Sequence, residues 1–274
     1  MTTVPLPNWP YPRWVAHRGA GKLAPENTLA AFRQGASHGY RMFECDVKLS
    51  SDGVPFLLHD AELERTTNAA DALGTSEAAA GNDKVKESRI AGDMPWHELS
   101  QLDAGSWHSP TYAGEPLPTL EAIARFCLRN GYFLNIEIKP TPGTEHHTGI
   151  VVAQHAARLW QGAAVPPLLT SFDIPALQGA FESQPELPRG LLIDGLQGQP
   201  WSAWLAKALA LQCQAIVCNY RLWNSDTVAQ AKAAGFRTLS YTVNDAAEAT
   251  RLLDLGTDAV ITDKVDVFTP ADSK

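Results

Sequence analysis

The 274-residue sequence has few cysteines and no long apolar run. Its four cysteines (Cys45, Cys127, Cys213 and Cys218) have the spacing of neither a disulfide scaffold nor a zinc site. We therefore expect buried, reduced thiols in a cytoplasmic protein. No apolar stretch reaches the roughly 18 residues that a membrane span needs. The amino-terminal stretch, with its prolines and aromatic residues, lacks the basic start and apolar core of a signal peptide, so no export is expected.

Basic residues are also scarce. The chain has 22 Lys and Arg residues against 30 Asp and Glu residues, a formal net charge of -8. This balance leaves no basic footprint for nucleic acid or for an anionic membrane. The expected partner is a small molecule, and an anionic one would need a local positive site.

Short apolar runs rich in β-branched or aromatic residues alternate with amphipathic segments, a pattern typical of βα units around a parallel sheet. Strands are predicted at 14–16, 42–46, 134–138, 168–171, 190–193, 215–218, 237–241 and 258–261. Helices are predicted at 28–37, 119–129, 149–159, 176–182, 201–211, 225–234 and 246–255. Gly39, Gly131, Gly235 and Gly256 follow helices and favour left-handed C-caps. A complete (β/α)8 barrel typically needs about 250 residues. The sequence therefore predicts a single (β/α)8 TIM-type barrel over 1–274.

One further apolar run, 55–60, follows the second strand across only Ser50, Ser51, Asp52 and Gly53. This linker is too short for a helical crossover but suits a hairpin turn, so the run must pair antiparallel. Hairpin register puts His59 opposite residues 44–46. An insertion, 61–117, then precedes the third barrel strand. Its Ala- and Gly-rich middle, 68–93, is expected to be a mobile loop, with a tolerated surface insertion favoured over an active-site lid.

Residues that are unusual barrel fillers stand at the predicted strand ends, where barrel enzymes carry their functional groups. Glu44 and Asp46 share one face of a strand because they are two residues apart, and Glu137 and Lys139 do so on another strand. Three carboxylates at one mouth repel one another unless a cation lies among them. Ligands that are all oxygen favour Mg²⁺ or Ca²⁺ over zinc, so one such divalent cation is predicted.

Basic groups accompany these carboxylates. Arg18 and Lys139 make the mouth of the predicted barrel a local anion-binding site, which suits a phosphate ester as the ligand. His17 and His59 suggest a division of labour, in which one removes a proton and the other donates one. Taken singly, each of these histidines is more commonly a structural hydrogen-bonding group, but their convergence favours the functional interpretation.

Several polar residues keep a structural interpretation. Lys139 has Glu137 or Glu44 as an alternative ion-pair partner, and Ser171 suits a backbone hydrogen bond at a strand end. The remaining histidines are predicted on surface helices or loops: His38, His97, His108, His146, His147 and His155.

Short motifs run through the chain: HRGAGKLAPENT at 17–28, ECDV at 44–47, SDG at 51–53, HDAELERT at 59–66, LPTLE at 117–121, NIEIK at 135–139, SF at 171–172, YTVN at 241–244 and DAVITD at 258–263. In order and spacing they resemble the glycerophosphodiester phosphodiesterase family over nearly the whole chain. Segment 8–13 is similar to that of its cytoplasmic bacterial members linked to glycerol phosphate uptake.

The resemblance implies a metal-dependent TIM-barrel phosphoric diester hydrolase that converts glycerophosphodiesters to glycerol 3-phosphate and an alcohol. It implies attack by the glycerol 2-hydroxyl to give a cyclic phosphate, which water then opens, with His17 and His59 as the acid/base pair. The implied metal ligands are Glu44, Asp46 and Glu137.

The resemblance also implies substrate contacts from Arg18, Lys139, Phe172 and Tyr241, the two aromatic residues walling the glycerol end. Glu26 is expected to orient the Arg18 region, and Asn27 to cap the following helix. The chain departs from the family pattern in the long Ala-rich insertion and in Tyr241, where many members carry Trp. Two other functions stay open: a Schiff-base lyase that uses Lys139, and a non-catalytic barrel that binds a phosphate ester.

Overall fold

A closed parallel barrel forms the body of the protein in the computed structural model, which describes residues 6–72 and 89–270. Its strands are β1 (Trp14–Ala16), β2 (Met42–Leu49), β4 (Phe133–Ile138), β5 (Leu168–Ser171), β6 (Arg189–Ile193), β7 (Ala215–Asn219), β8 (Arg237–Tyr241) and β9 (Ala259–Thr262). Each strand pairs parallel with the next, and β1 closes the barrel by pairing with both β9 and β2. The predicted TIM-type barrel is confirmed.

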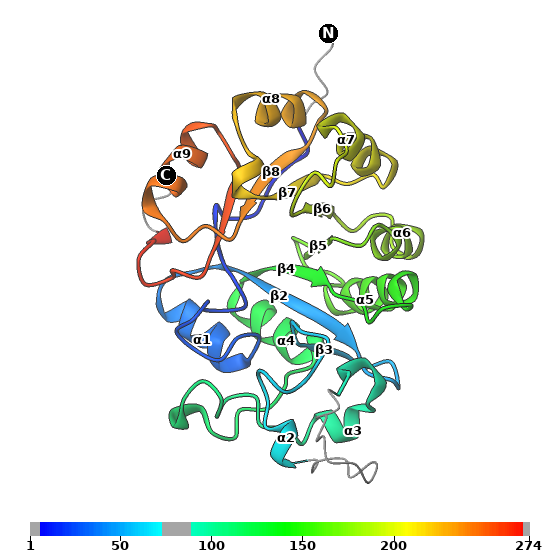
Figure 1. The fold of residues 1–274 in the computed structure, drawn as a ribbon, viewed down its shortest axis with the longest axis vertical. Coiled ribbons are helices and arrows are strands. Elements are labelled where there is room, and N and C mark those ends of the chain that lie inside the picture. Colours follow the sequence, from blue (N-terminus) through cyan, green and yellow to red (C-terminus); the bar gives the residue numbers. More distant parts are fainter. Residues whose placement is uncertain (1–5, 73–88, 271–274) are drawn as a thin grey trace, which may run out of the picture.

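Helices cover the outside of this barrel. They are α1 (Leu29–Ser37), α4 (Leu120–Asn130), α5 (Glu145–Leu159), α6 (Ile174–Ser183), α7 (Trp201–Ala210), α8 (Ser225–Ala233) and α9 (Ala246–Asp254). In Figure 1, α5 to α9 follow one another around the sheet, and α1 and α4 cover the remaining side. The glycines predicted as C-caps have left-handed φ angles between 65° and 89°, as expected.

Two helices begin earlier than predicted. Helix α5 begins at Glu145, and Gly149 lies inside it, where an added Cβ would stand 1.9 Å from the Ala176 carbonyl oxygen of α6. This glycine therefore marks the close approach of two helices and not a helix start. Helix α6 begins at Ile174 because a proline at its second position needs no hydrogen-bond partner there.

The predicted hairpin is present. Strand β3 (Pro55–Leu57) pairs antiparallel with the end of β2, with Val47 opposite Leu57. Beyond the strand, the Leu58 N–H donates to the Asp46 carbonyl oxygen at 3.1 Å. This register brings His59 to the level of residues 44–46, as predicted.

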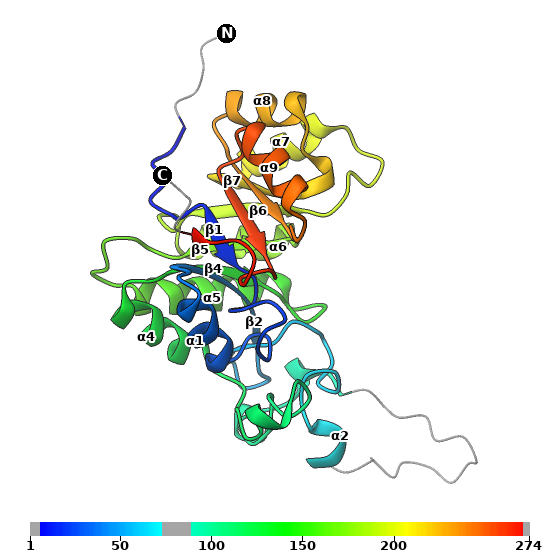
Figure 2. The same cartoon turned by 90° about the vertical axis from the view of Figure 1, so that its left-hand side faces the viewer.

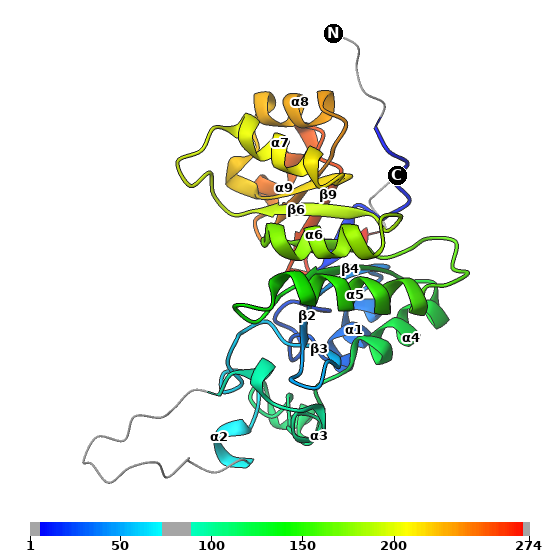
Figure 3. The ribbon, with the colours of Figure 1, turned by 90° about the vertical axis from the view of Figure 1, so that its right-hand side faces the viewer.

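The insertion that follows packs around its own apolar cluster, which contains Phe56, Leu58, Leu63, Leu99, Leu102 and Leu117. It includes α2 (Ala69–Ala72), α3 (Trp96–Leu99) and the short 3-10 helices η1 (Ala91–Asp93) and η2 (Pro110–Tyr112). Figure 3 shows α2 and α3 at the end of the molecule farthest from α7 and α8, and Figure 2 shows α2 at the same end. Most of the loop predicted at 68–93 lies outside the described residues, and its mobility stays a prediction, as does the assignment of 1–274 to a single domain.

Alternate residues of the strands fill the inside of the barrel and change from apolar to polar toward one end. The apolar layers contain Val15, Met42, Leu168, Leu192, Val217, Leu239 and Ile261, with Tyr11 packed against them. Two residues beyond Val15 the same face carries His17, and two beyond Met42 it carries Glu44. The carboxyl ends of the strands therefore bear the polar side chains.

Two expectations about composition can be compared with the structure. The four cysteines are free and buried, as predicted. Each helix in the described part of the chain is too short or too polar to cross a membrane.

Candidate active site

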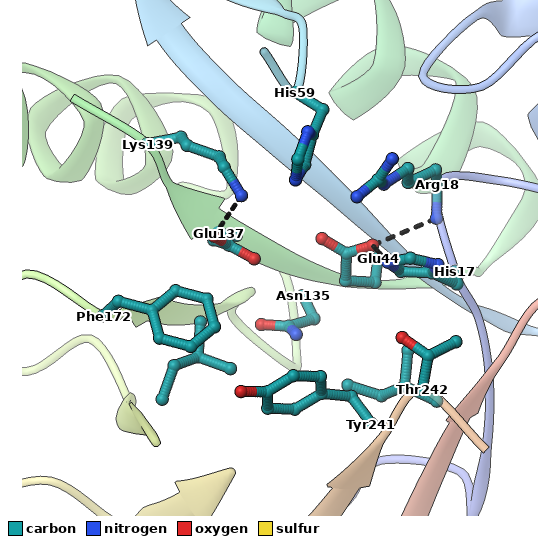
Figure 4. Close-up of a pocket in the computed structure, with 12 residues that line it drawn as sticks. His17, Arg18, Glu44, His59, Asn135, Glu137, Lys139, Phe172, Tyr241 and Thr242 are labelled. Atoms are coloured by element: carbon teal, nitrogen blue, oxygen red, sulfur yellow. Dashed lines mark hydrogen bonds and ion pairs between the residues drawn. The ribbon is translucent and has the colours of Figure 1, made fainter. Parts of the chain in front are cut away.

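A pocket opens at the carboxyl ends of the strands, and Figure 4 shows the side chains around it. It is lined by His17, Arg18, Glu44, His59, Asn135, Glu137, Lys139, Phe172, Leu192, Tyr241, Thr242 and Ile261. Every predicted site residue except Asp46 is among them. The Asp46 side chain is 1% exposed and contacts two of the lining residues, Arg18 and Lys139. The structure thus brings the whole predicted set together.

Three carboxylates converge in this pocket. Glu44, Asp46 and Glu137 each offer an oxygen within 4.8 Å of the others. Glu44 Oε2 accepts from the Arg18 backbone N–H at 3.0 Å, whereas Glu44 Oε1 is buried and has no hydrogen-bond partner among the described residues. Burial and the charge of Asp46 raise the pKa of Glu44 to about 8, and the same causes raise the pKa of Glu137. A hard cation would satisfy the orphaned oxygen and offset this repulsion, so the residues fit a divalent metal.

Asp46 differs from its two neighbours because cations already surround it. Arg18 Nε lies 3.3 Å from Asp46 Oδ2, and Lys139 Nζ lies 3.4 Å from Asp46 Oδ1. Burial favours the neutral acid, but the charges of Lys139 and Arg18 outweigh it and lower the pKa of Asp46. Lys139 also donates to Glu137 Oε1 at 2.9 Å, so its partners are Glu137 and Asp46 rather than Glu44.

The prediction that Asn27 caps the first helix is wrong. Thr28 is the N-cap, and its Oγ1 accepts from the Ala31 N–H at 3.2 Å. Asn27 has a φ of 60°, and both ends of its amide bind Asp46: Nδ2 donates to Oδ2 at 2.8 Å, and Oδ1 accepts from the backbone N–H at 3.1 Å. The amide therefore orients a carboxylate of the site.

Each histidine of the pocket is held at Nδ1 by an aspartate. His17 Nδ1 lies 2.6 Å from Asp263 Oδ1, and His59 Nδ1 lies 2.6 Å from Asp60 Oδ1. These contacts leave both Nε2 atoms for other partners, and both rings border the pocket in Figure 4.

The surroundings shift the two histidines in opposite directions. For His17, burial disfavours the charged ring, but the hydrogen bond to Asp263 and the charge of Glu44 outweigh burial and raise the pKa. For His59, burial lowers the pKa with the help of Arg18 and Lys139, in spite of Asp46.

The opposite side of the pocket is aromatic. The rings of Phe172 and Tyr241 pack edge to face with centroids 5.8 Å apart. Lys139 Nζ lies 5.9 Å from the centroid of the Phe172 ring, at the border between the charged and the aromatic sides. Beside them, the Tyr241 hydroxyl donates to Asp194 Oδ1 at 3.4 Å.

Sequence reasoning missed several residues of the site. Asn135 lines the pocket and accepts from Thr170 Oγ1 at 3.0 Å. It stands two residues before Glu137, as Asp263 stands two residues after Ile261, so the alternation of the strands could have indicated both.

Ser171 donates to the Ile138 carbonyl oxygen at 2.6 Å, the structural role that was predicted for it. The six other histidines are exposed or half-buried, as expected.

Comparison with known proteins identifies the family. The glycerophosphoryl diester phosphodiesterase family model matches residues 17–267. The chain belongs to this family. As a glycerophosphodiester phosphodiesterase family member, it is a phosphoric diester hydrolase.

Several bacterial relatives of this phosphodiesterase match it over nearly their whole length. The glycerophosphodiester phosphodiesterase of Caldanaerobacter subterraneus is 30% identical over 91% of this chain and 93% of the relative. An Oleispira antarctica phosphodiesterase, solved with the product sn-glycerol-3-phosphate, has a TM-score of 0.80 and 32% identity over 96% of this chain and 98% of its own. The Agrobacterium tumefaciens glycerophosphodiester phosphodiesterase has a TM-score of 0.74 and 25% identity over 94% and 99%.

Gly21 lies close to the backbone of Asp263, whose side chain holds His17 in this phosphodiesterase. Gly21 has a φ of 58°, and an added Cβ would lie 2.2 Å from the backbone oxygen of Asp263, the residue that holds His17. Gly53 has a similar φ of 82°, with nothing within 4 Å of an added Cβ. We expect Gly53→Ala to lower the free energy of unfolding by about 1 to 2 kcal/mol through its left-handed φ. We expect Gly21→Ala to lower it by about 1 to 3 kcal/mol more, through overpacking.

Urea unfolding of the two variants measures this difference. Because the clash pushes Asp263 away from His17, Gly21→Ala should also lose hydrolytic activity while Gly53→Ala keeps it. Equal losses of stability in both variants would show that the close approach of Gly21 to Asp263 contributes nothing.

Proposed function

We propose that the protein hydrolyses glycerophosphodiesters to glycerol 3-phosphate and an alcohol, with one divalent cation, Mg²⁺ or Ca²⁺, as cofactor. The observation that carries the proposal is the meeting, in one pocket, of a carboxylate cluster, two basic side chains and two histidines held by aspartates. The glycerol phosphate product bound to the Oleispira relative supports the same class of substrate. A cytoplasmic location stays a prediction from the cysteine content.

The charged residues divide into two tasks. Glu44, Asp46 and Glu137 would hold the cation, which when bound would stabilise charge that develops on the phosphoryl oxygens. Arg18 and Lys139 would bind the phosphate, with Arg18 offering paired donors and Lys139 a point charge. Their ion pairs with Asp46 fix both side chains at the pocket before substrate arrives.

The histidines would move the protons. With a proton on Nδ1 bonded to aspartate, a neutral ring presents Nε2 as an acceptor, and a protonated ring presents it as a donor. One histidine then removes the proton of the attacking hydroxyl, and the other protonates the leaving oxygen. We propose the glycerol 2-hydroxyl as the nucleophile, because attack within one molecule can contribute about 7 to 11 kcal/mol. This attack would release the alcohol and give a cyclic phosphate, which water would then open to glycerol 3-phosphate. Phe172 and Tyr241 would enclose the glycerol end.

The surroundings of Lys139 argue against imine chemistry. A Schiff base forms from a neutral amine. Burial of Lys139 favours that form, but the carboxylates of Asp46 and Glu137 outweigh burial and raise the pKa of Lys139. This lysine is therefore a better phosphate ligand than a nucleophile.

Product analysis tests the proposed function. The purified protein with glycerophosphoethanolamine and Mg²⁺ or Ca²⁺ should release glycerol 3-phosphate, measured with a coupled dehydrogenase assay, and other headgroups establish its preference. Absence of product with every headgroup and both cations would favour a non-catalytic binding barrel. Borohydride trapping of an aldehyde adduct on Lys139 would favour the lyase.

A further inference from the structure

An arginine outside the pocket joins two sides of the site. The Arg65 side chain is 46% exposed and contacts the carboxylates of Glu26 and Asp60. Its Nη1 and Nη2 donate to the two oxygens of Glu26, at 2.9 and 2.7 Å. Its Nε donates to Asp60 Oδ2, and its Nη2 also donates to Asp60 Oδ1 at 3.1 Å. One guanidinium thus makes two bidentate pairs.

Each of these carboxylates holds a group that lines the pocket. Glu26 Oε1 also accepts from Arg18 Nη1 at 2.9 Å. Asp60 Oδ1 is the atom that lies 2.6 Å from His59 Nδ1. A continuous chain of charged contacts therefore runs from the His59 ring, through Arg65, to the Arg18 guanidinium. It connects the segment after β3 with the segment before α1.

The insertion anchors the backbone that carries this arginine. Leu63 is fully buried in the apolar cluster of the insertion. The Leu63 carbonyl oxygen accepts from Thr67 Oγ1 at 2.7 Å, so the turn that contains Arg65 is fixed on both sides. The ion pairs of Arg65 with Glu26 and Asp60 therefore connect the insertion to the mouth of the barrel.

We propose that Arg65 is a positioning residue, which fixes the His59 ring and the Arg18 guanidinium relative to each other. Because both oxygens of each carboxylate are bound, Asp60 cannot rotate away from His59, nor Glu26 from Arg18. Proton transfer and phosphate binding are thereby aligned in one geometry, on which catalysis depends steeply. The inference rests on the proposed function, since it assigns Arg65 to that same site.

A merely structural ion pair predicts a different effect on kcat, because its removal would leave kcat unchanged. Stability does not separate the two cases: exposed ion pairs contribute little to it, so removing Arg65 should scarcely change unfolding in either case. Under the proposal, Arg65→Ala lowers kcat about 10- to 100-fold, the scale expected for a misplaced catalytic group. Arg65→Lys should recover little of this loss, because an ammonium cannot make two bidentate pairs. Added guanidinium ion should restore part of the kcat of Arg65→Ala, and methylammonium should not.

A mutant cycle, in which Glu26 and Asp60 are substituted together, shows whether Arg65 acts through its two carboxylates. With Glu26→Gln and Asp60→Asn already present, Arg65→Ala should lower kcat less than 2-fold further, because its route to the site is gone. The matched control is Arg125→Ala, which removes an exposed arginine paired with Glu121 on α4 and should leave kcat unchanged.

The outcomes separate this inference from the proposed function. Failure of the unmodified protein to release glycerol 3-phosphate would overturn the proposed function. An active protein whose Arg65→Ala variant keeps full kcat, or loses the same factor in the Glu26→Gln, Asp60→Asn background, would overturn the role of Arg65 alone. Full activity in Arg65→Lys would reduce that role to charge.

Discussion

His17→Ala and His59→Ala are each expected to lower kcat by about 100-fold or more, the usual scale of acid/base catalysis. Each ring is held at Nδ1 by an aspartate at 2.6 Å and borders the pocket. Each substitution therefore removes one group that is oriented for proton transfer. The measurement is kcat at saturating glycerophosphodiester and cation. His97→Ala is the control, because that ring is 78% exposed on α3. Turnover retained in both site variants would contradict the proposed pair.

A second substrate separates the two histidines. A diester with a nitrophenol leaving group needs no protonation on departure, so the variant that lacks the general acid should recover on it. The variant that lacks the general base should stay impaired, because the attacking hydroxyl is unchanged. Equal recovery of both variants would contradict a division of labour between the rings.

The period of two in the strands made much of the site predictable. It placed Glu44 beside Asp46 and Glu137 beside Lys139, and the short turn of the hairpin placed His59 at the same level. These predictions use only local geometry, and Figure 4 shows Glu44, His59, Glu137 and Lys139 around one pocket. The same rule applied to Asn135 would have added it to the site.

Contacts between distant segments were beyond such reasoning. Asn27 has the residue type of a helix cap, but its left-handed φ and its two bonds to Asp46 depend on how the β1–α1 loop lies against β2. Arg65 stands in a recognised motif, yet its partner Glu26 is 39 residues away. No periodicity relates two such positions, because the path of the chain between them sets the contact.

Removal of divalent cations is expected to abolish hydrolysis and to lower Tm. Without a cation, Glu44, Asp46 and Glu137 keep oxygens within 4.8 Å of one another, and Glu44 Oε1 keeps no hydrogen-bond partner among the described residues. A cation present at 100 times its Kd stabilises the folded state by about 2.7 kcal/mol. For a chain of this size that corresponds to a rise in Tm of roughly 5 to 10 °C. Activity and thermal unfolding are compared after dialysis against EDTA and after addition of Mg²⁺ or Ca²⁺.

Glu44→Gln is the control for this prediction, because it keeps the shape of the side chain and removes its charge. The variant should lose activity, and its Tm should no longer respond to the cation. Because the raised pKa already keeps Glu44 largely protonated when no cation is bound, the neutral amide should leave the Tm in EDTA no lower than that of the unmodified protein. Hydrolysis at an undiminished rate in EDTA would contradict the role of the metal. Since the Tm response does not depend on turnover, it tests the cation site even if the histidine assignments fail.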